Sequence, residues 1–377
     1  MNIRIVAAVA RKEYYHLIRD YRSLYLAFAI PIILILLFGY ALSLDVENIK
    51  TVVVDYDRTV LSRDFLGKFE ASPYFKIIDF LPNSAAATDA LDHGKTTMAL
   101  IIPPGWTAQI HADRESPLQV LLDGSDPNFA GIARTYITTF IDVYNSRLLR
   151  NFLNRQGMEE LHTPVEGRIR VWFNEDLESR NFIVPGIIAV IIMIVGAILT
   201  SLVIAREYEN GTMETLRSLP ITASEFLIGK SIPYFFIGLA DVLVAIFMGQ
   251  VLFGVVMKSS FWLMMLASSL YLMVALALGL LISSITKSQL LANQGAILVT
   301  YLPSLLLSNF VFPISNMPKP LQMLTYAVPA TYYVDILSGI YLKHLGLADM
   351  WPSVCVMAGM VLVLMALNIA TLRKEGF

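Results

Sequence analysis

The chain alternates long apolar runs with short charged connections. A helix rises about 1.5 Å per residue, so runs of about 20 apolar residues can cross a hydrocarbon layer about 30 Å thick. Runs of this kind cover residues 23–43, 182–205, 232–256, 259–286, 290–312 and 350–372. The pattern therefore predicts an α-helical membrane protein with six transmembrane helices.

The segment before the first run, residues 1–22, has the 3.6-residue period of an amphipathic helix. Its apolar side chains recur on one face, and its basic side chains fall away from that face. The apolar set is Ile3, Val6, Ala10, Tyr14, Leu17 and Tyr21, and the basic set is Arg4, Arg11, Lys12, Arg19 and Arg22. A basic amphipathic helix beside a membrane span is expected to lie in the membrane interface.

Residues 44–180 have a different pattern, in which short β-branched and aromatic runs alternate with helical periods. The runs predict strands at 51–55, 75–80, 98–102, 118–122 and 168–173, and helices at 62–71, 84–93 and 128–154. Asp126 is expected to cap the last helix, with Pro127 at its first position. The alternation predicts a small α/β domain inserted between the first and second spans.

The basic residues in the short connections predict the orientation. Most gather on one side of the membrane, and the opposite side has only Lys258, Lys319 and Lys343. Because cytoplasmic loops are enriched in Lys and Arg, both termini are expected in the cytoplasm and residues 44–180 outside it. In a two-membrane bacterium the chain would lie in the inner membrane, with this domain in the periplasm.

The last outer connection, at about residues 313–349, is rich in proline and aromatic residues but remains apolar. We expect short helices that dip into the membrane near its outer face. Such re-entrant backbone requires cover by protein or a water-filled cavity.

Composition excludes several classes of function. The chain is 56% hydrophobic and 15% charged, with a net charge of −2, which is atypical of a soluble enzyme or a nucleic-acid-binding protein. The single cysteine, Cys355, excludes an intramolecular disulfide. Segments 89–96 and 224–231 only partly match the ATP-binding loop motif, and the dispersed histidines form no metal-ligand pattern. We therefore expect no enzyme activity, no metal and no cofactor bound by this chain.

The charged segment at about residues 206–222 follows the second apolar run and is too short to be a domain. Gly211 is expected to break the helix, and Thr212 to cap a short new helix with Glu214 in its first turn. A small amphipathic helix against the membrane face is a surface on which another protein could act. An ordinary solvated loop is the alternative.

Several polar residues interrupt the apolar runs. Asp241 is expected to face a partner or a wet cavity, on the same broad helix face as Gln250. Its carboxyl group could serve packing between helices or contact a transported substrate. Other polar side chains in the second and fifth runs are candidates to line a translocation path or a dimer seam: Thr200, Ser201, Asn293, Gln294, Thr300 and Ser304.

Over nearly its full length, the chain resembles the membrane subunits (permeases) of bacterial ABC exporters of the ABC-2 class. The most specific part is Ala205-Arg206-Glu207-Tyr208-Glu209-Asn210-Gly211-Thr212-Met213-Glu214-Thr215-Leu216, which continues to Leu219-Pro220-Ile221-Thr222 and Gly229-Lys230. Supporting matches are Lys12-Glu13, Arg19-Asp20, Phe38-Gly39-Tyr40, Pro313 and Pro329.

The resemblance implies a coupling helix after the second span, which docks in a cleft of a separate ATPase subunit. The implied coupling residues are Arg206, Glu207, Glu209, Gly211, Thr212, Met213, Glu214 and Leu216. ATP and magnesium would bind that partner, and a second permease copy or a paralogue would complete the transporter. The nearest subgroup, exporters of drugs or other amphipathic compounds, often works with a periplasmic adaptor protein.

Other interpretations remain open. The transported substrate could instead be linked to a lipid or a polymer. A membrane-anchored extracytoplasmic binding or sensor protein is a different class, although six spans are more than an anchor requires. An ion-coupled secondary transporter would be expected to have internal repeats or more intramembrane charges.

Overall fold

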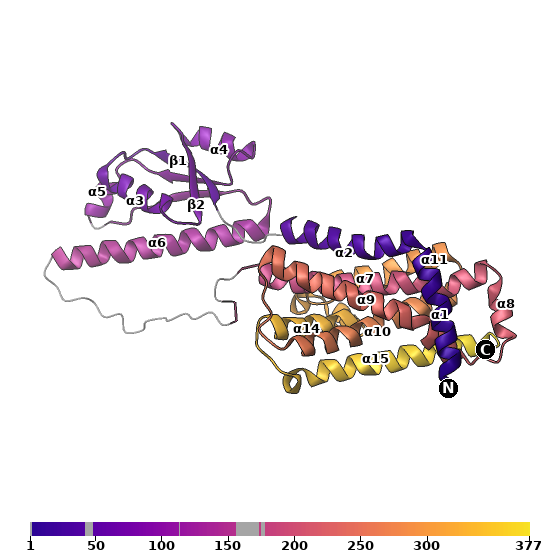
Figure 1. Ribbon diagram of the computed structural model, residues 1–377. Coiled ribbons are helices and arrows are strands. Elements are labelled where there is room, and N and C mark those ends of the chain that lie inside the picture. Colours follow the sequence, from indigo (N-terminus) through magenta and orange to yellow (C-terminus); the bar gives the residue numbers. More distant parts are fainter. Residues whose placement is uncertain (1, 42–47, 113, 156–172, 175–177) are drawn as a thin grey trace. The chain divides into compact units, whose positions relative to one another are not determined.

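The computed structural model describes residues 2–41, 48–112, 114–155, 173–174 and 178–377. The chain divides into two compact units (Figure 1). Residues 44–169 form the α/β unit, and residues 1–43 with 170–377 form the helical unit.

The α/β unit is built around a four-stranded sheet with strand order β2-β1-β3-β4. Strands β1, β2 and β3 are parallel, and β4 pairs with β3 in the antiparallel direction. The elements are β1 (Ile49–Asp55), α3 (Val60–Glu70), β2 (Phe75–Phe80), α4 (Ser84–Asp92), β3 (Met98–Ile102), α5 (Trp106–His111), β4 (Gln119–Leu122) and α6 (Pro127–Arg155).

Helices cover both faces of this sheet. One face packs Val53 and Leu100 against Phe65 of α3, Trp106 of α5 and Tyr144 of α6. The other face packs β1 and β3 against α4. Because the central strand β3 is buried on both faces, all five of its residues are apolar, and the sequence shows a continuous apolar run.

The sequence predictions for this unit are confirmed where the structure describes them. The first four expected strands and all three expected helices are present, whereas the short helix α5 was not predicted. Asp126 caps α6 as expected, since its carboxylate accepts a hydrogen bond of 3.2 Å from the Phe129 N–H. The fifth expected strand, 168–173, lies almost wholly outside the described residues.

The helical unit is a bundle of long apolar helices joined by short ones. Its elements are α1 (Ile3–Arg19), α2 (Tyr21–Ala41), α7 (Arg180–Glu209), α8 (Thr212–Arg217), α9 (Ala223–Phe253), α10 (Phe261–Thr286), α11 (Gln289–Ala296), the π-helical segment η1 (Ile297–Tyr301), α12 (Leu302–Leu306), the 3₁₀ segment η2 (Ile314–Asn316), α13 (Lys319–Thr325), α14 (Pro329–Tyr341) and α15 (Leu347–Lys374).

Among the described residues, four helices are long and apolar enough to cross a membrane: α7, α9, α10 and α15. Helix α2 contains a shorter apolar stretch, Phe28–Tyr40. The fifth expected span is divided into α11, η1 and α12, with Pro303 in the last piece. Helical structure therefore covers most of each expected run, although the fifth ends at Leu306, and six membrane crossings remain a prediction.

Helix α7 lies at the centre of the bundle and is buried over nearly its whole length. It approaches α10 closely because Gly279 leaves no side chain between the two backbones, and a Cβ there would overlap Thr200 and Ala197. Polar bonds join the same two helices. Ser283 of α10 accepts hydrogen bonds from the N–H groups of Ile204, at 3.0 Å, and Ala205, at 2.8 Å. Small residues and interhelical hydrogen bonds are typical of helices packed within a membrane.

Helix α1 packs on α9, and its buried face differs from the expected one. Val6, Val9, Glu13 and Leu17 are buried, whereas Ile3 and Tyr14 are exposed. The apolar pattern missed Glu13 because a carboxylate was assumed to face water. Its burial requires partners within the protein, and these define the candidate site.

Candidate functional site

A buried ionic network joins α1, α7 and α9 at one end of the helical unit. The Lys230 ammonium of α9 lies 2.8 Å from a carboxylate oxygen of Glu13 in α1 and 2.7 Å from one of Glu207 in α7. The Lys230 side chain is only 2% exposed. An ammonium group is buried at this depth only when charged partners and hydrogen bonds replace water.

Three further side chains complete the network. Lys12 lies 2.8 Å from Glu207, and the Tyr234 hydroxyl donates a hydrogen bond of 2.9 Å to Glu13. The Thr212 hydroxyl, at the start of α8, also donates to Glu207. Two lysines balance two glutamates, so the network is neutral overall and links four helices.

Helix α8 is held against the bundle at both ends. Thr212 bonds to Glu207 at its first residue, and Arg217 at its last residue lies 3.2 Å from Glu375, just beyond α15. Met213 is buried between these anchors. Figure 1 shows α1, α8 and both chain ends at the same end of the helical unit. The segment is therefore attached to two separate parts of the bundle, the end of α7 and the residue after α15.

The helix start differs from the expectation in one detail. Gly211, not Thr212, occupies the N-cap position, with a φ of 70° in the left-handed region that favours glycine. Thr212 is the first helical residue, and its hydroxyl is used by Glu207 instead. The expected break at Gly211 is present.

The outward face of α8 and the turn after it is a small mixed surface. It consists of Glu214, Thr215, Ser218 and Leu219, all of them exposed. We call these four residues the α8 face.

Other residues of the expected coupling segment have partners inside this chain. The carboxylate of Glu207 and the side chain of Met213 face the bundle, and Leu216 is partly buried. Glu209 accepts a hydrogen bond of 2.7 Å from the Gln289 N–H, at the start of α11. Arg206 pairs with Asp20, between α1 and α2, at 3.1 Å. The side chains of Glu207 and Met213 therefore hold α8 in place and do not lie on the protein surface, whereas the coupling role of the segment stays a prediction.

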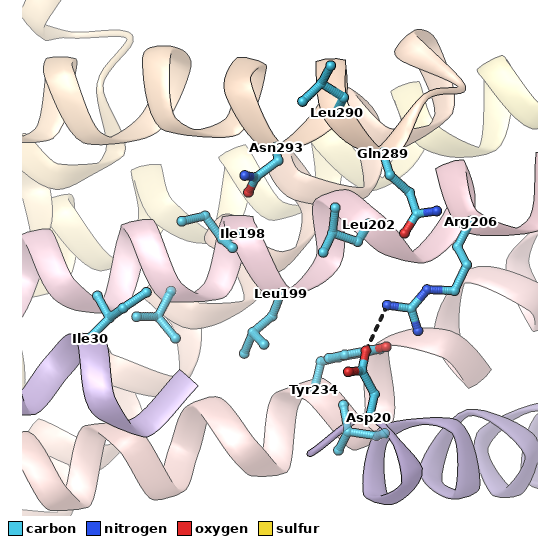
Figure 2. Close-up of a pocket in the computed structure, with 12 residues that line it drawn as sticks. Asp20, Ile30, Ile198, Leu199, Leu202, Arg206, Tyr234, Gln289, Leu290 and Asn293 are labelled. Atoms are coloured by element: carbon cyan, nitrogen blue, oxygen red, sulfur yellow. Dashed lines mark hydrogen bonds and ion pairs between the residues drawn. The ribbon is translucent and has the colours of Figure 1, made fainter. Parts of the chain in front are cut away.

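A cavity of about 380 Å³ lies beside this network, between α7 and α11 and next to the junction of α1 and α2. Figure 2 shows apolar side chains of α7 along one wall, Asn293 and Gln289 of α11 opposite them, and the Asp20–Arg206 ion pair at one end. Ile30 of α2 adds to the apolar lining. The cavity therefore combines apolar walls with one polar end, which suits an amphipathic molecule.

The structure separates the polar residues expected to line a path. Thr200, Ser201, Thr300 and Ser304 are buried among the helices of this chain. Thr200 donates a hydrogen bond of 3.0 Å to the Leu276 carbonyl, which joins α7 to α10. Among the expected residues, Asn293 lines the cavity and Gln294 is exposed. Thr200 and Ser201 are fully buried within this protomer, so neither side chain reaches its surface.

Asp241 and Gln250 lie on opposite sides of α9, contrary to the expectation. Asp241 is 3% exposed, whereas Gln250 is exposed. Nine residues at 100° each correspond to two and a half turns, so their side chains diverge. Neither carboxyl oxygen of Asp241 has a hydrogen-bond partner in the part of the chain that the structure describes.

From the sequence, Glu13 and Lys230 were visible only within the family matches Lys12-Glu13 and Gly229-Lys230, without a role of their own. Two signals could have revealed the network. Glu13 lies at helical spacing between the apolar residues Val9 and Leu17, and Lys230 directly precedes a long apolar run. Two opposite charges on apolar faces suggest a buried pair.

The bundle of long apolar helices, with an ionic network and an anchored surface helix at one end, defines a multi-helix membrane protein. Comparison with known proteins identifies its family. The family described as "ABC-2 family transporter protein" matches residues 22–370, so the chain belongs to the ABC-2 transporter family. The resemblance noted in the sequence is thereby confirmed.

Relatives cover almost the same length. The chain is 34% identical to the "Probable multidrug ABC transporter permease YbhS" of Escherichia coli, over 91% of this chain and 89% of that protein. It is 29% identical to the "Probable multidrug ABC transporter permease YbhR", over 91% of each. The "Inner membrane transport permease YhhJ" is 28% identical over 80% of this chain and 78% of its own length.

Proposed function

We propose that this chain is the membrane-spanning permease subunit of an ATP-driven exporter, powered by a separate ATPase subunit. Membership of the ABC-2 family supports a transporter, and the names of YbhS and YbhR support a permease of an ABC system. The sequence contains no complete ATP-binding loop motif, so ATP and magnesium would bind the partner.

The anchored helix α8 is the observation that carries this proposal. Work done by an ATPase on another chain must cross a protein interface, and that interface needs an exposed surface with a stiff connection to the membrane helices. The α8 face supplies the surface. The bonds from Thr212 to Glu207 and from Arg217 to Glu375 supply the connection. Glu214 would bond to a basic group of the ATPase, and Leu219 would enter an apolar cleft.

The cavity supports an amphipathic cargo. Its apolar walls would accept a hydrophobic body, and Asn293, Gln289 and the Asp20–Arg206 pair would meet polar atoms. A multidrug substrate range fits these surroundings and the names of YbhS and YbhR.

A second permease copy, identical or a paralogue, would complete the path. Leu290 lines the cavity and is also exposed, so the cavity reaches the protomer surface at α11. Leu291, Leu298 and Val299 extend this exposed apolar surface along α11 and η1. The proposed seam therefore runs along the fifth expected span, without α7. An active complex that contains one permease copy would contradict this part of the proposal.

The proposed location is the bacterial inner membrane, with α8 and both termini in the cytoplasm and residues 44–180 in the periplasm. The basic residues near α1, α8 and the C-terminus support this orientation. A periplasmic adaptor protein would bind outside the membrane. If an impermeant thiol reagent labelled a cysteine placed at Asn210 in intact cells, the orientation would be reversed.

Substitutions on α8 test the coupling role. Glu214→Ala removes the outward carboxylate, and loss of one partner of a charged pair at an interface costs about 2–5 kcal/mol. Gly211→Pro forces φ to about −65° where the chain has 70°, so it redirects the start of α8. We expect both variants to insert normally, to bind the ATPase at least about tenfold more weakly and to lose export. Co-purification and drug efflux measure these outcomes.

The matched control is Glu70→Ala, which removes an exposed carboxylate from α3 of the α/β unit. This variant should bind the ATPase and export normally. Normal ATPase binding and export by both α8 variants, at normal expression, would remove α8 from the mechanism.

A further inference from the structure

A second hollow lies on the other side of α1, between α1 and α9. It has a volume of about 400 Å³. Its lining is Ala10, Arg11, Tyr14 and Leu17 from α1 and Ile232, Pro233, Phe236 and Ile237 from α9. Leu17 also borders the first cavity. We call the second space the α1–α9 groove.

One cation stands in an otherwise apolar lining. Arg11 is exposed, and its guanidinium carbon lies 5.7 Å from the centre of the Tyr15 ring. Within the described part of the chain, Arg11 forms no ion pair, unlike Lys12, which is paired with Glu207. The Arg11 guanidinium group, next to the apolar groove, therefore has no anionic partner among the described residues.

The floor of the groove continues into an outward apolar stripe of α9. Phe236 is 64% exposed, Phe247 65% and Val251 61%. Together with the exposed Leu243 they recur at intervals of four or seven residues, so they occupy one side of the helix. From Phe236 to Val251 this side is about 22 Å long, which exceeds half of a hydrocarbon layer of about 30 Å.

We propose that the α1–α9 groove binds an anionic phospholipid, with its phosphate at Arg11 and an acyl chain against Phe236 and the α9 stripe. The guanidinium fork matches phosphate oxygens in two parallel hydrogen bonds. Charge complementarity selects an anionic headgroup, because Arg11 carries a positive charge that no carboxylate neutralises in the described part of the chain. The apolar stripe selects a lipid rather than free phosphate, which would gain nothing from Phe236.

A lipid bound at this place would also affect the packing of α1. Neighbouring residues of α1 belong to the ionic network, since Lys12 and Glu13 contact Glu207 and Lys230. A lipid held by Arg11 would fix α1 on α9 and thereby steady the base of α8. The lipid site is a property of the chain in a membrane and does not depend on which cargo it exports or on the ATPase.

Native mass spectrometry of the purified full-length chain tests the site. The chain is mixed with equal amounts of phosphatidylglycerol and phosphatidylcholine that carry the same acyl chains. Wild-type protein should retain phosphatidylglycerol preferentially. Arg11→Gln should lower its retention about fivefold, the effect expected from one cation near an anionic surface. Arg11→Lys should keep part of the preference, because the charge remains but the fork is lost.

Arg4→Gln is the matched control, since Arg4 is exposed on α1 and does not line the groove. It should bind phosphatidylglycerol as the wild type does. Equal losses in the two glutamine variants would assign the lipid to the basic helix as a whole and overturn a groove site. Unchanged retention in Arg11→Gln, or displacement of the lipid by inorganic phosphate alone, would also overturn it. Size-exclusion profiles verify that each variant is folded.

Discussion

The two units of this protein bury different kinds of side chain. In the α/β unit the buried polar side chains that the structure describes are neutral hydroxyls: Thr51, Ser62 and Thr96. In the helical unit the buried set includes five charged residues: Glu13, Glu207, Glu225, Lys230 and Asp241. Hydroxyl and amide side chains such as Thr200, Ser283 and Asn368 are buried there as well.

The difference follows from what holds each unit together. Neighbouring strands are joined by their backbones, and water drives apolar helices onto the sheet, so the core needs few polar side chains. A helix satisfies its own backbone, and lipid supplies little hydrophobic force between helices. Contacts between helices then depend on close packing at small residues and on polar side chains. Buried polar groups with partners, such as Glu13, Lys230 and Ser283, therefore mark joints between helices.

Loss of Lys230 should have the largest effect, because it joins three helices. Lys230→Ala would leave Glu13 and Glu207 buried without their shared cation, and such a loss costs about 3–5 kcal/mol. We expect strong thermal destabilisation of the full chain and release of α1, measured by hydrogen exchange at residues 3–19. Lys12→Ala is the control. Its side chain is 41% exposed, so its pair with Glu207 contributes at most about 1 kcal/mol.

A neutral replacement of the whole network sharpens this test. The triple variant Lys230→Met, Glu13→Gln and Glu207→Gln removes all three buried charges together. Most of the stability lost in Lys230→Ala should therefore return. If Lys230→Ala destabilised the chain no more than Lys12→Ala, the network would not be a joint.

Close packing between helices should have the next largest effect. Gly279→Ala would place a Cβ against Thr200 and the Ala197 carbonyl, and overpacking of this kind costs about 1–3 kcal/mol. The melting temperature of the purified chain reports the loss. Gly359→Ala in α15 is the matched substitution, since no heavy atom lies within 4 Å of its added Cβ. It should be neutral or slightly stabilising. Similar losses at both positions would mean that helix contacts here tolerate added volume.

The smallest effect is expected in the α/β unit, where the charged side chain of Asp57 stabilises a loop and does not connect two transmembrane helices. Asp57 accepts hydrogen bonds from the Thr107 N–H, at 3.1 Å, and the Thr59 hydroxyl, at 2.9 Å. Burial alone would raise the pKa of Asp57, but hydrogen bonds from Thr107 and Thr59 hold it below its ordinary value. Asp57→Asn should cost about 1 kcal/mol. Faster hydrogen exchange in α5, with little change in the helical unit, would report this.

The same carboxylate gives a pH dependence with a defined sign. Because the folded pKa of Asp57 is depressed, its contribution to stability is present above about pH 4 and is lost as the pH falls through the folded value. The difference between wild type and Asp57→Asn should therefore shrink in that acidic range. A difference that persisted unchanged there would show that the charge is not the cause.

Features that depend on local pattern could be predicted without a structure. Apolar runs located the long helices, and alternation with short β-branched runs predicted the α/β unit in nearly the observed order. Gly211 predicted the break before α8, because only glycine adopts the left-handed conformation there without strain. The family motif around residues 205–216 was also visible without a structure.

The faces on which these helices meet could not be predicted and are known from the three-dimensional packing. Glu207 was expected to point at another protein, and it instead bonds to Lys230 and Lys12, which are distant in sequence. Asp241 and Gln250 were expected together and lie apart, and α7 packs at the centre of the bundle. A helical period in the sequence indicates that a side chain is buried against another segment, but it does not indicate which segment. That choice depends on the packing of separate segments, where a buried charge is stable only if its partner arrives from elsewhere in the chain.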